Sequence, residues 1–237
     1  MLTVYRLTIR QLSSWSRLAI MVTLAAMPVW ITLLMLREND APTVGDFEQF
    51  VLSTMFAGSI VPLVVLAIAA VAFSNEVEDK TLANLTLSPL PRWKIALPKL
   101  LAAVTIAAPL IVLSALLTAH IAFLGEWKAT IAITVSAIAA VAMYASMFVW
   151  LGLASPQAVG TGLLYVVIWE GFFSQFVTGV RLLSIRHYSI ALMNVFDERR
   201  FATYDHLNTP ALLVMITLVI GGFLVLTIRR LKRMDVP

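Results

Sequence analysis

The chain has 237 residues, of which 60% are hydrophobic and 13% charged, and it contains no cysteine. Water-soluble domains are roughly 45–50% apolar and about 25% charged, so this composition excludes a soluble globular protein and indicates an integral membrane protein. A net charge of +4 would suggest nucleic-acid binding in a soluble chain, but in a membrane protein basic residues flank the spans, and we expect no nucleic-acid partner.

The segment before the first long apolar run predicts a helix at the membrane surface. Apolar residues recur there at helical spacing, at Leu2, Tyr5, Ile9 and Leu12. The basic residues gather on another face, at Arg6, Arg10 and Arg17. An amphipathic helix of this kind, over residues 2–16, lies in the cytoplasmic interface of the bilayer. The alternative is an ordinary cytoplasmic extension of the first span.

Six apolar stretches are long enough to cross a hydrocarbon core of about 30 Å as helices. They cover residues 18–36, 50–73, 95–124, 129–154, 156–180 and 210–228. The third would measure about 45 Å as one helix, so we expect its start to project into the cytoplasm and Pro109 to kink it. The fourth and fifth are separated mainly by Ser155-Pro156, because proline interrupts a helix. The predicted fold class is an all-α polytopic membrane protein, with residues 1–237 forming a single transmembrane domain.

The distribution of Lys and Arg predicts that both termini are cytoplasmic. Eleven of the 17 basic residues occur in the N-terminal segment, the connector between spans two and three and the C-terminal segment, at Arg6, Arg10, Arg17, Lys80, Arg92, Lys94, Lys99, Arg229, Arg230, Lys232 and Arg233. Because cytoplasmic segments are enriched in Lys and Arg, loop 37–49 and segment 181–209 are expected outside.

The connector between the second and third spans holds the largest cluster of charges. Its notable positions are, in order, Glu76, Glu78, Asp79, Thr81, Leu82, Leu85, Pro89, Arg92 and Lys99. The acids come first, where they favour the positive end of a helix dipole, and the bases come last, where they anchor the next span at the headgroups. We expect a short surface helix whose exposed leucines await a partner. The alternative is a solvated turn whose leucines dip into lipid.

The run Glu76-x-Glu78-x-x-Thr81-Leu82, then Pro89-x-x-Arg92 and Lys99, resembles the cytoplasmic segment of ABC-2 type transporter permeases. The family usually has glycine where this chain has Lys80, and often where it has Pro98; these departures leave the charge pattern intact. The resemblance extends to the interfacial helix, the six spans, the large outer segment and the stretch "YVVIWEGFF".

The resemblance implies that the connector is a coupling helix that docks on a separate ATPase subunit. Glu76, Glu78, Thr81, Leu82 and Leu85 would then face the ATPase, and Arg92 and Lys99 would fix the helix to the third span. No Gly-x-x-x-x-Gly-Lys-Ser/Thr loop occurs in this sequence, so we expect no ATPase site and no enzyme activity in this chain, with ATP and Mg²⁺ bound by the partner.

The resemblance also implies the wider assembly. The working unit would hold two permease copies, a homodimer here, and two ATPase chains. It would reside in the plasma (inner) membrane and act as an exporter. Nothing in the spans selects a substrate.

Glu170 lies in the middle of the fifth predicted span. A charge at bilayer depth costs at least about 2.5–3.5 kcal/mol, so this side chain should face protein or water. It could be protonated, or it could pair with Arg181 or with another chain. A place on the transport pathway and a hydrogen bond at the interface of two permease copies both remain open.

The outer segment 181–209 is amphipathic and opens with Arg181, Arg186, His187 and Tyr188. The resemblance implies short helices that dip back towards the membrane and cap the exit. These four residues are therefore candidates for substrate release or for binding an extracytoplasmic partner protein. A plain interfacial loop is the alternative.

Other functions need features that this sequence shows weakly. A six-span enzyme acting on lipid would need polar catalytic groups at one depth, and Glu170 is isolated. Ser59 and His120 resemble an intramembrane serine protease only faintly. The three histidines lie far apart, so we expect no metal site, and Met143 with Met147 is the one same-face methionine pair. A structural subunit of a larger membrane complex is a further alternative.

Overall fold

The computed structural model describes residues 1–37, 47–78, 91–174, 183–197, 201 and 208–233, and every regular element in these ranges is a helix. The predicted all-α class is therefore confirmed. The elements are α1 Leu2–Leu12, α2 Trp15–Met35, η1 Glu48–Ile60, α4 Val61–Ala69, α5 Val71–Glu78, α7 Trp93–Ala122, α8 Trp127–Ala154, α9 Ala158–Leu164, η2 Tyr165–Phe173, α11 Ile185–Phe196 and α12 Thr209–Arg233.

Five of the described helices are long and apolar enough to cross a membrane. They are Trp15–Met35, Phe50–Glu78, Trp93–Ala122, Trp127–Ala154 and Thr209–Arg233. The predicted span 156–180 corresponds to a shorter apolar helix, Ala158–Phe173, and residues 175–182 lie outside the described ranges. The break before it is where the sequence indicates: Ser155 is extended, with φ −130° and ψ 134°, and α9 begins at Ala158.

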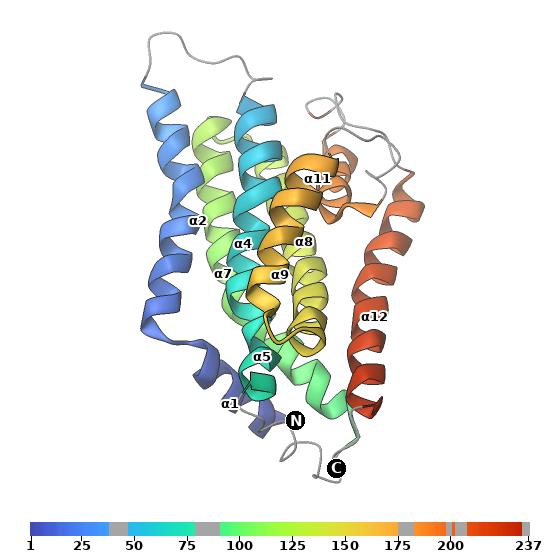
Figure 1. The fold of residues 1–237 in the computed structure, drawn as a ribbon. Helices are drawn as coiled ribbons and strands as arrows, with labels where there is room; N and C mark the ends of the chain where they lie inside the picture. Colours follow the sequence, from blue (N-terminus) through green and yellow to red (C-terminus); the bar gives the residue numbers. More distant parts are fainter. Residues whose placement is uncertain (38–46, 79–90, 175–182, 198–200, 202–207, 234–237) are drawn as a thin grey trace.

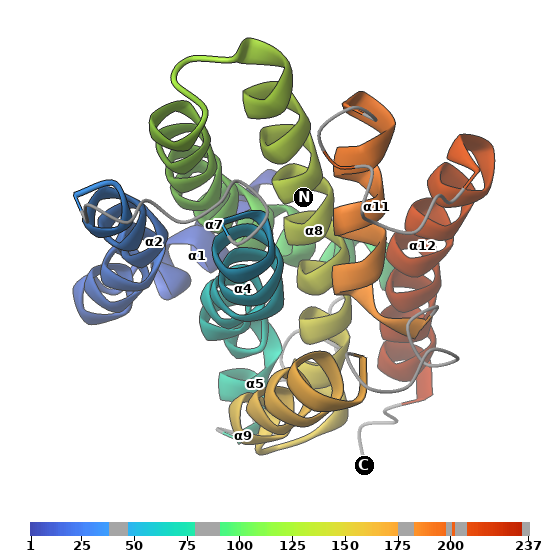
Figure 2. The same ribbon diagram turned by 90° about the horizontal axis from the view of Figure 1, so that it is seen from above.

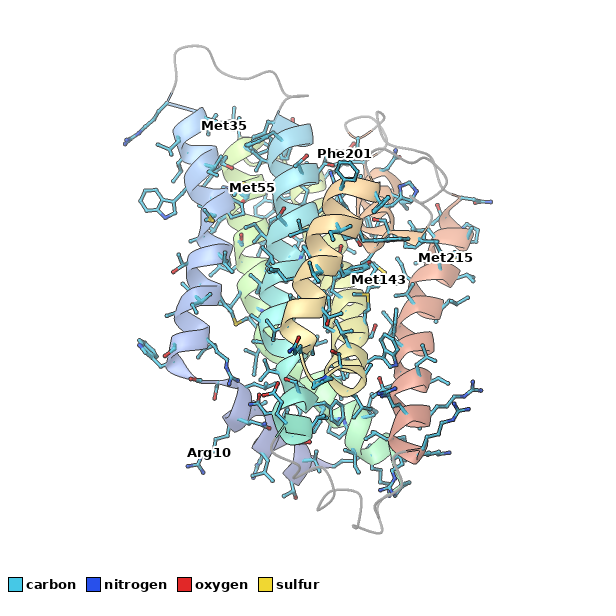
Figure 3. The ribbon with its side chains drawn as sticks, in the orientation of Figure 1. Arg10, Met35, Met55, Met143, Phe201 and Met215 are labelled. Carbon is cyan, nitrogen blue, oxygen red and sulfur yellow. The ribbon has the colours of Figure 1, made fainter. Side chains whose placement is uncertain are left out.

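The N-terminal amphipathic helix is shorter than predicted. It ends at Leu12, and α2 begins at Trp15, so residues 13 and 14 separate two helices instead of extending the first to residue 16. Leu12 is buried and the Tyr5 hydroxyl donates to Thr105 Oγ1 at 3.1 Å, which attaches α1 to α7. Arg6 and Arg10 are exposed, and Figure 3 shows Arg10 pointing away from the bundle. The apolar and basic faces therefore separate as the pattern indicates.

The bundle is built around α8. This helix packs against α4, α7, α11 and α12, whereas α2 and α12 lie on opposite flanks of the molecule (Figure 2). Figure 1 shows α1, α5 and the C-terminal end of α12 at one end of the bundle. Helix α7 runs unbroken through Pro98 and Pro109. The labelled methionines Met35, Met55, Met143 and Met215 lie apart on four elements (Figure 3).

Two segments have the wider π-helical turn, in which backbone hydrogen bonds reach five residues along the chain. They are η1, in the second span, and η2, which holds the "YVVIWEGFF" stretch. The two segments contact one another. Because π-turns are frequently found at functional sites, the region where η1 and η2 meet is a candidate site.

Candidate functional site

A buried ion pair joins α5 to α7. The side chain of Lys99 is 1% exposed, and its Nζ donates to Glu76 Oε1 and to the carbonyl oxygen of Ala72, each at 2.5 Å. The same Nζ lies 4.4 Å from the centroid of the Phe73 ring. A buried ammonium needs such partners to offset its lost hydration. Because all three partners belong to α5, Lys99 fixes that helix against α7.

The second carboxyl oxygen of Glu76, Oε2, takes no part in this ion pair. Oε2 is buried and has no hydrogen-bond partner among the residues that the structure describes. Glu78 ends α5 and is exposed, and Arg92 precedes the first residue of α7. The structure thus brings together Glu76 and Lys99 from the sequence-predicted coupling set. The others of that set between these helices lie outside the described residues: Asp79, Thr81, Leu82, Leu85 and Pro89.

The second site is centred on Glu170, whose side chain is fully buried in η2. The Tyr165 hydroxyl donates to Oε1 at 2.9 Å, and the Ser184 hydroxyl donates to Oε2 at 2.5 Å. The backbone N–H of Ile185 also donates to Oε1, at 3.1 Å. Ser184 is the N-cap of α11 and Ile185 is its first residue. The carboxyl group of one helix therefore caps the N-terminus of another, where the helix dipole favours negative charge.

Arg186 of α11 makes two further hydrogen bonds, to η2 and to η1. One guanidinium nitrogen, Nη1, donates to the Glu170 carbonyl oxygen at 3.3 Å, and Nη2 donates to Ser53 Oγ in η1 at 2.8 Å. Gly58 leaves room for this guanidinium, since a Cβ there would lie 3.2 Å from Nη1. We call Ser53, Tyr165, Glu170, Ser184 and Arg186 the Glu170 cluster; it links η1, η2 and α11.

Helix α11 is packed into the bundle and is not a plain interfacial loop. Nine of its 12 residues are buried, including Arg186 and Tyr188, and it contacts α8, α12 and η1. The Ser136 hydroxyl of α8 donates to the carbonyl oxygen of Ser189. The His187 and Tyr188 rings lie 6.0 Å apart, and burial raises the pKa of the Tyr188 phenol. Arg181, the remaining candidate of this segment, lies outside the described residues.

An open and mainly apolar groove of about 660 Å³ runs between the two π-helical segments. Its lining residues are Gly58, Ser59, Leu63, Val166, Val167, Ile168, Gly171, Phe172 and Phe173. The groove adjoins the Glu170 cluster at Gly58, which lies beneath the Arg186 guanidinium.

A family model described as "ABC-2 family transporter protein" matches residues 15–187, well over half of the chain. The chain belongs to the ABC-2 transporter family. A search of curated proteins found no match. The resemblance inferred from residues 76–99 is therefore confirmed, and the chain is a membrane-embedded transport protein of a family that works with ATPase subunits.

The ABC-2 match runs from the start of α2 into the first turn of α11. It contains the Lys99–Glu76 pair and the whole Glu170 cluster, and it leaves out α1 and α12. The partners of Glu170 in this ABC-2 chain belong to the chain itself. The sequence predicts that this carboxyl group faces protein or water, and the structure shows protein partners; the suggested partner Arg181 lies outside the described residues.

The sequence reasoning missed three members of the Glu170 cluster. Ser184 carried a usable signal, because a serine directly before an amphipathic run is a common helix N-cap. Ser53 and Tyr165 carried none: a serine in an apolar span ordinarily bonds back to its own helix, and a tyrosine in a span is ordinarily a packing or interfacial residue. Their partners are 133 and 5 residues away.

Proposed function

We propose that this chain is the permease subunit of an ATP-driven ABC-2 exporter, coupled to a separate ATPase chain. ATP and Mg²⁺ would bind on that partner, and the permease would contribute the path across the membrane. The observation that carries the proposal is the family match together with the buried Lys99–Glu76 pair at the end of α5.

The pair supports the proposal because of where it lies. Helix α5 leads directly into residues 79–90, the segment that the family resemblance assigns to ATPase docking. A force on that segment would act on α5 through the chain. The Lys99 contacts to Ala72, Phe73 and Glu76 would pass it to α7, and the packing of α5 against α8 would pass it to the centre of the bundle. Nucleotide would shift the permease between states only if those states bind it differently.

A second copy of the chain would complete the pathway. Large apolar side chains are exposed along α2 and α12, for example Trp30 and Leu34 on α2 and Leu213 and Leu218 on α12. Such faces suit either acyl chains or another permease copy. The basic residues at the C-terminal end of α12 lie at the same end as α1, which supports cytoplasmic termini in a plasma membrane.

Co-purification tests the proposal. Tagged permease, extracted from cells that express its ATPase partner, should recover that ATPase chain, with a mass that fits two copies of each by light scattering. Recovery of no ATPase chain by the unaltered permease would overturn the proposal.

Charge reversal locates the contact. Glu78→Lys alters the exposed acid at the end of α5 and should weaken ATPase recovery by about tenfold, since like charges across an interface repel. Glu126→Lys is the matched control, because Glu126 is an exposed acid at the start of α8, at the other end of the bundle. Equal recovery by the two variants would contradict coupling through α5.

A further inference from the structure

Helix α11 is attached to the bundle through polar contacts concentrated in its first turn. The Ser184 hydroxyl and the Ile185 N–H donate to the Glu170 carboxyl group. Arg186 also donates to Glu170, at the backbone carbonyl oxygen instead of the carboxyl group. One residue of η2 is thus held both at its side chain and at its backbone by three consecutive residues, the N-cap of α11 and the first two residues of that helix.

The attachment involves the two π-helical segments of the described chain. Glu170 and Ser53 both lie in π-helical segments. The Glu170 carbonyl oxygen accepts from Ser174 Oγ at 2.6 Å as well as from Arg186. Backbone of this kind is rare in proteins and is frequently found at functional sites.

The length and position of α11 would allow it to move relative to the spans. Twelve helical residues measure about 18 Å, so α11 is too short to cross the roughly 30 Å hydrocarbon core. It lies between α8 and α12, away from the end that holds α1 (Figures 1 and 2). A short helix in this position can withdraw from its neighbours without breaking a membrane span.

We propose that the Glu170 cluster is a latch that holds α11 inside the bundle, and that the latch opens during the transport cycle. Buried polar contacts of this kind favour two discrete states, because a partly opened cluster leaves buried polar groups unpaired. Only the second half of this inference, the opening during transport, rests on the proposed function.

Cysteine labelling tests the latch, because the natural chain has no cysteine. Ala191→Cys places a reporter in α11 at a site that is 3% exposed, and Ser114→Cys places a control at a 4% exposed site between α7 and α2. Each full-length variant is reconstituted in lipid nanodiscs without nucleotide. The measurement is the rate of alkylation by a membrane-impermeant maleimide.

Glu170→Gln should raise the labelling rate at Ala191→Cys by about tenfold or more, since an amide nitrogen would replace one of the two oxygens that accept hydrogen bonds and a buried donor would lose its partner. The rate at Ser114→Cys should stay unchanged. Ser53→Ala removes only the η1 side of the latch and should give a smaller rise, which keeps the test usable if Glu170→Gln fails to fold. An unchanged rate at Ala191→Cys, or an equal rise at both reporters, overturns the latch.

A second labelling experiment tests whether the latch opens during transport. It uses variants with Glu170 intact, assembled with the ATPase chain. Addition of ATP and Mg²⁺ should raise labelling at Ala191→Cys severalfold and leave Ser114→Cys unchanged. A rate at Ala191→Cys that does not respond to nucleotide overturns the opening step. Failure to recover any ATPase chain instead overturns the permease proposal, and the nucleotide-free arm still decides the latch.

Discussion

A Cβ atom on Gly152 would lie 2.1 Å from the carbonyl oxygen of Ala70, which is closer than real Cβ contacts come. Ala70 is the residue between α4 and α5, so the backbone of α8 lies directly against the junction that leads into α5. A second glycine makes a related contact: a Cβ on Gly162 would lie 2.2 Å from Leu66 Cδ1. Small residues permit such close helix approach in membranes.

Alanine at these glycines should give graded effects. Gly152→Ala forces two backbones apart and should destabilise the fold by about 3 kcal/mol or more. Gly162→Ala should cost less, because the leucine side chain can change rotamer. Gly160→Ala is the control: nothing lies within 4 Å of its Cβ position, and alanine favours a helix. Thermal unfolding followed by tryptophan fluorescence would rank the three, and equal midpoints for Gly152→Ala and Gly160→Ala would refute the close contact.

The Lys99–Glu76 pair should behave as a coupled unit. Lys99→Met leaves a carboxyl group without its cation and should cost about 3–5 kcal/mol, whereas Lys99→Met with Glu76→Gln should recover much of that loss. Glu78→Gln, at the exposed end of the same helix, should change stability little. The measurement is a double-mutant cycle of unfolding free energies in detergent. Additive single-variant effects would mean that the two side chains do not interact.

Much of the helical framework could be predicted from the sequence, because lipid offers no partner for backbone polar groups and an apolar run must form its own helix. The break at Ser155-Pro156 follows from this rule together with proline. The π-helical turns of η1 and η2 could not be predicted, since spans that are apolar on nearly every face carry no periodic signal that would reveal a change of turn.

Fewer residues of the candidate site than of the helical framework could be predicted from the sequence. Family spacing selected Glu76 and Lys99, and the cost of a buried charge selected Glu170. Their partners depend on three-dimensional packing, as in the contact between Ser53 and Arg186 across 133 residues. Only the family resemblance indicated short helices that dip back towards the membrane in the segment that holds α11, because hydropathy cannot distinguish a short amphipathic helix on the surface from one packed between spans.

Arg230 should stabilise the contact between α12 and α8. Its Nε donates to the Leu153 carbonyl at 3.1 Å and its Nη2 to the Ala154 carbonyl at 3.0 Å, at the C-terminal end of α8. A cation there satisfies terminal carbonyls and complements the helix dipole. Arg230→Ala should therefore lower the unfolding free energy by about 1–2 kcal/mol, and Arg229→Ala, at the exposed neighbouring position, should change it by less than about 0.5 kcal/mol. Similar losses for both variants would argue against this role.

Two tyrosines beside Phe148 should respond in opposite ways to loss of the hydroxyl group. The Tyr144 ring stacks on Phe148 and the Tyr165 ring packs edge-on against it, so Tyr→Phe preserves both ring contacts. Tyr165 donates to the Glu170 carboxyl group at 2.9 Å, whereas the buried Tyr144 hydroxyl lies near the same carboxyl group but makes no hydrogen bond of good geometry with any described residue.

Tyr165→Phe should cost about 1.5–3 kcal/mol and, if the latch exists, should raise labelling at Ala191→Cys. Tyr144→Phe should be neutral or slightly stabilising, because it removes a buried polar group that no described residue satisfies. Unfolding midpoints and labelling rates measured on the two variants side by side check both statements. A larger loss for Tyr144→Phe would show that its hydroxyl has a buried partner, such as a bridging water, and would move the centre of the polar cluster from η2 towards α8.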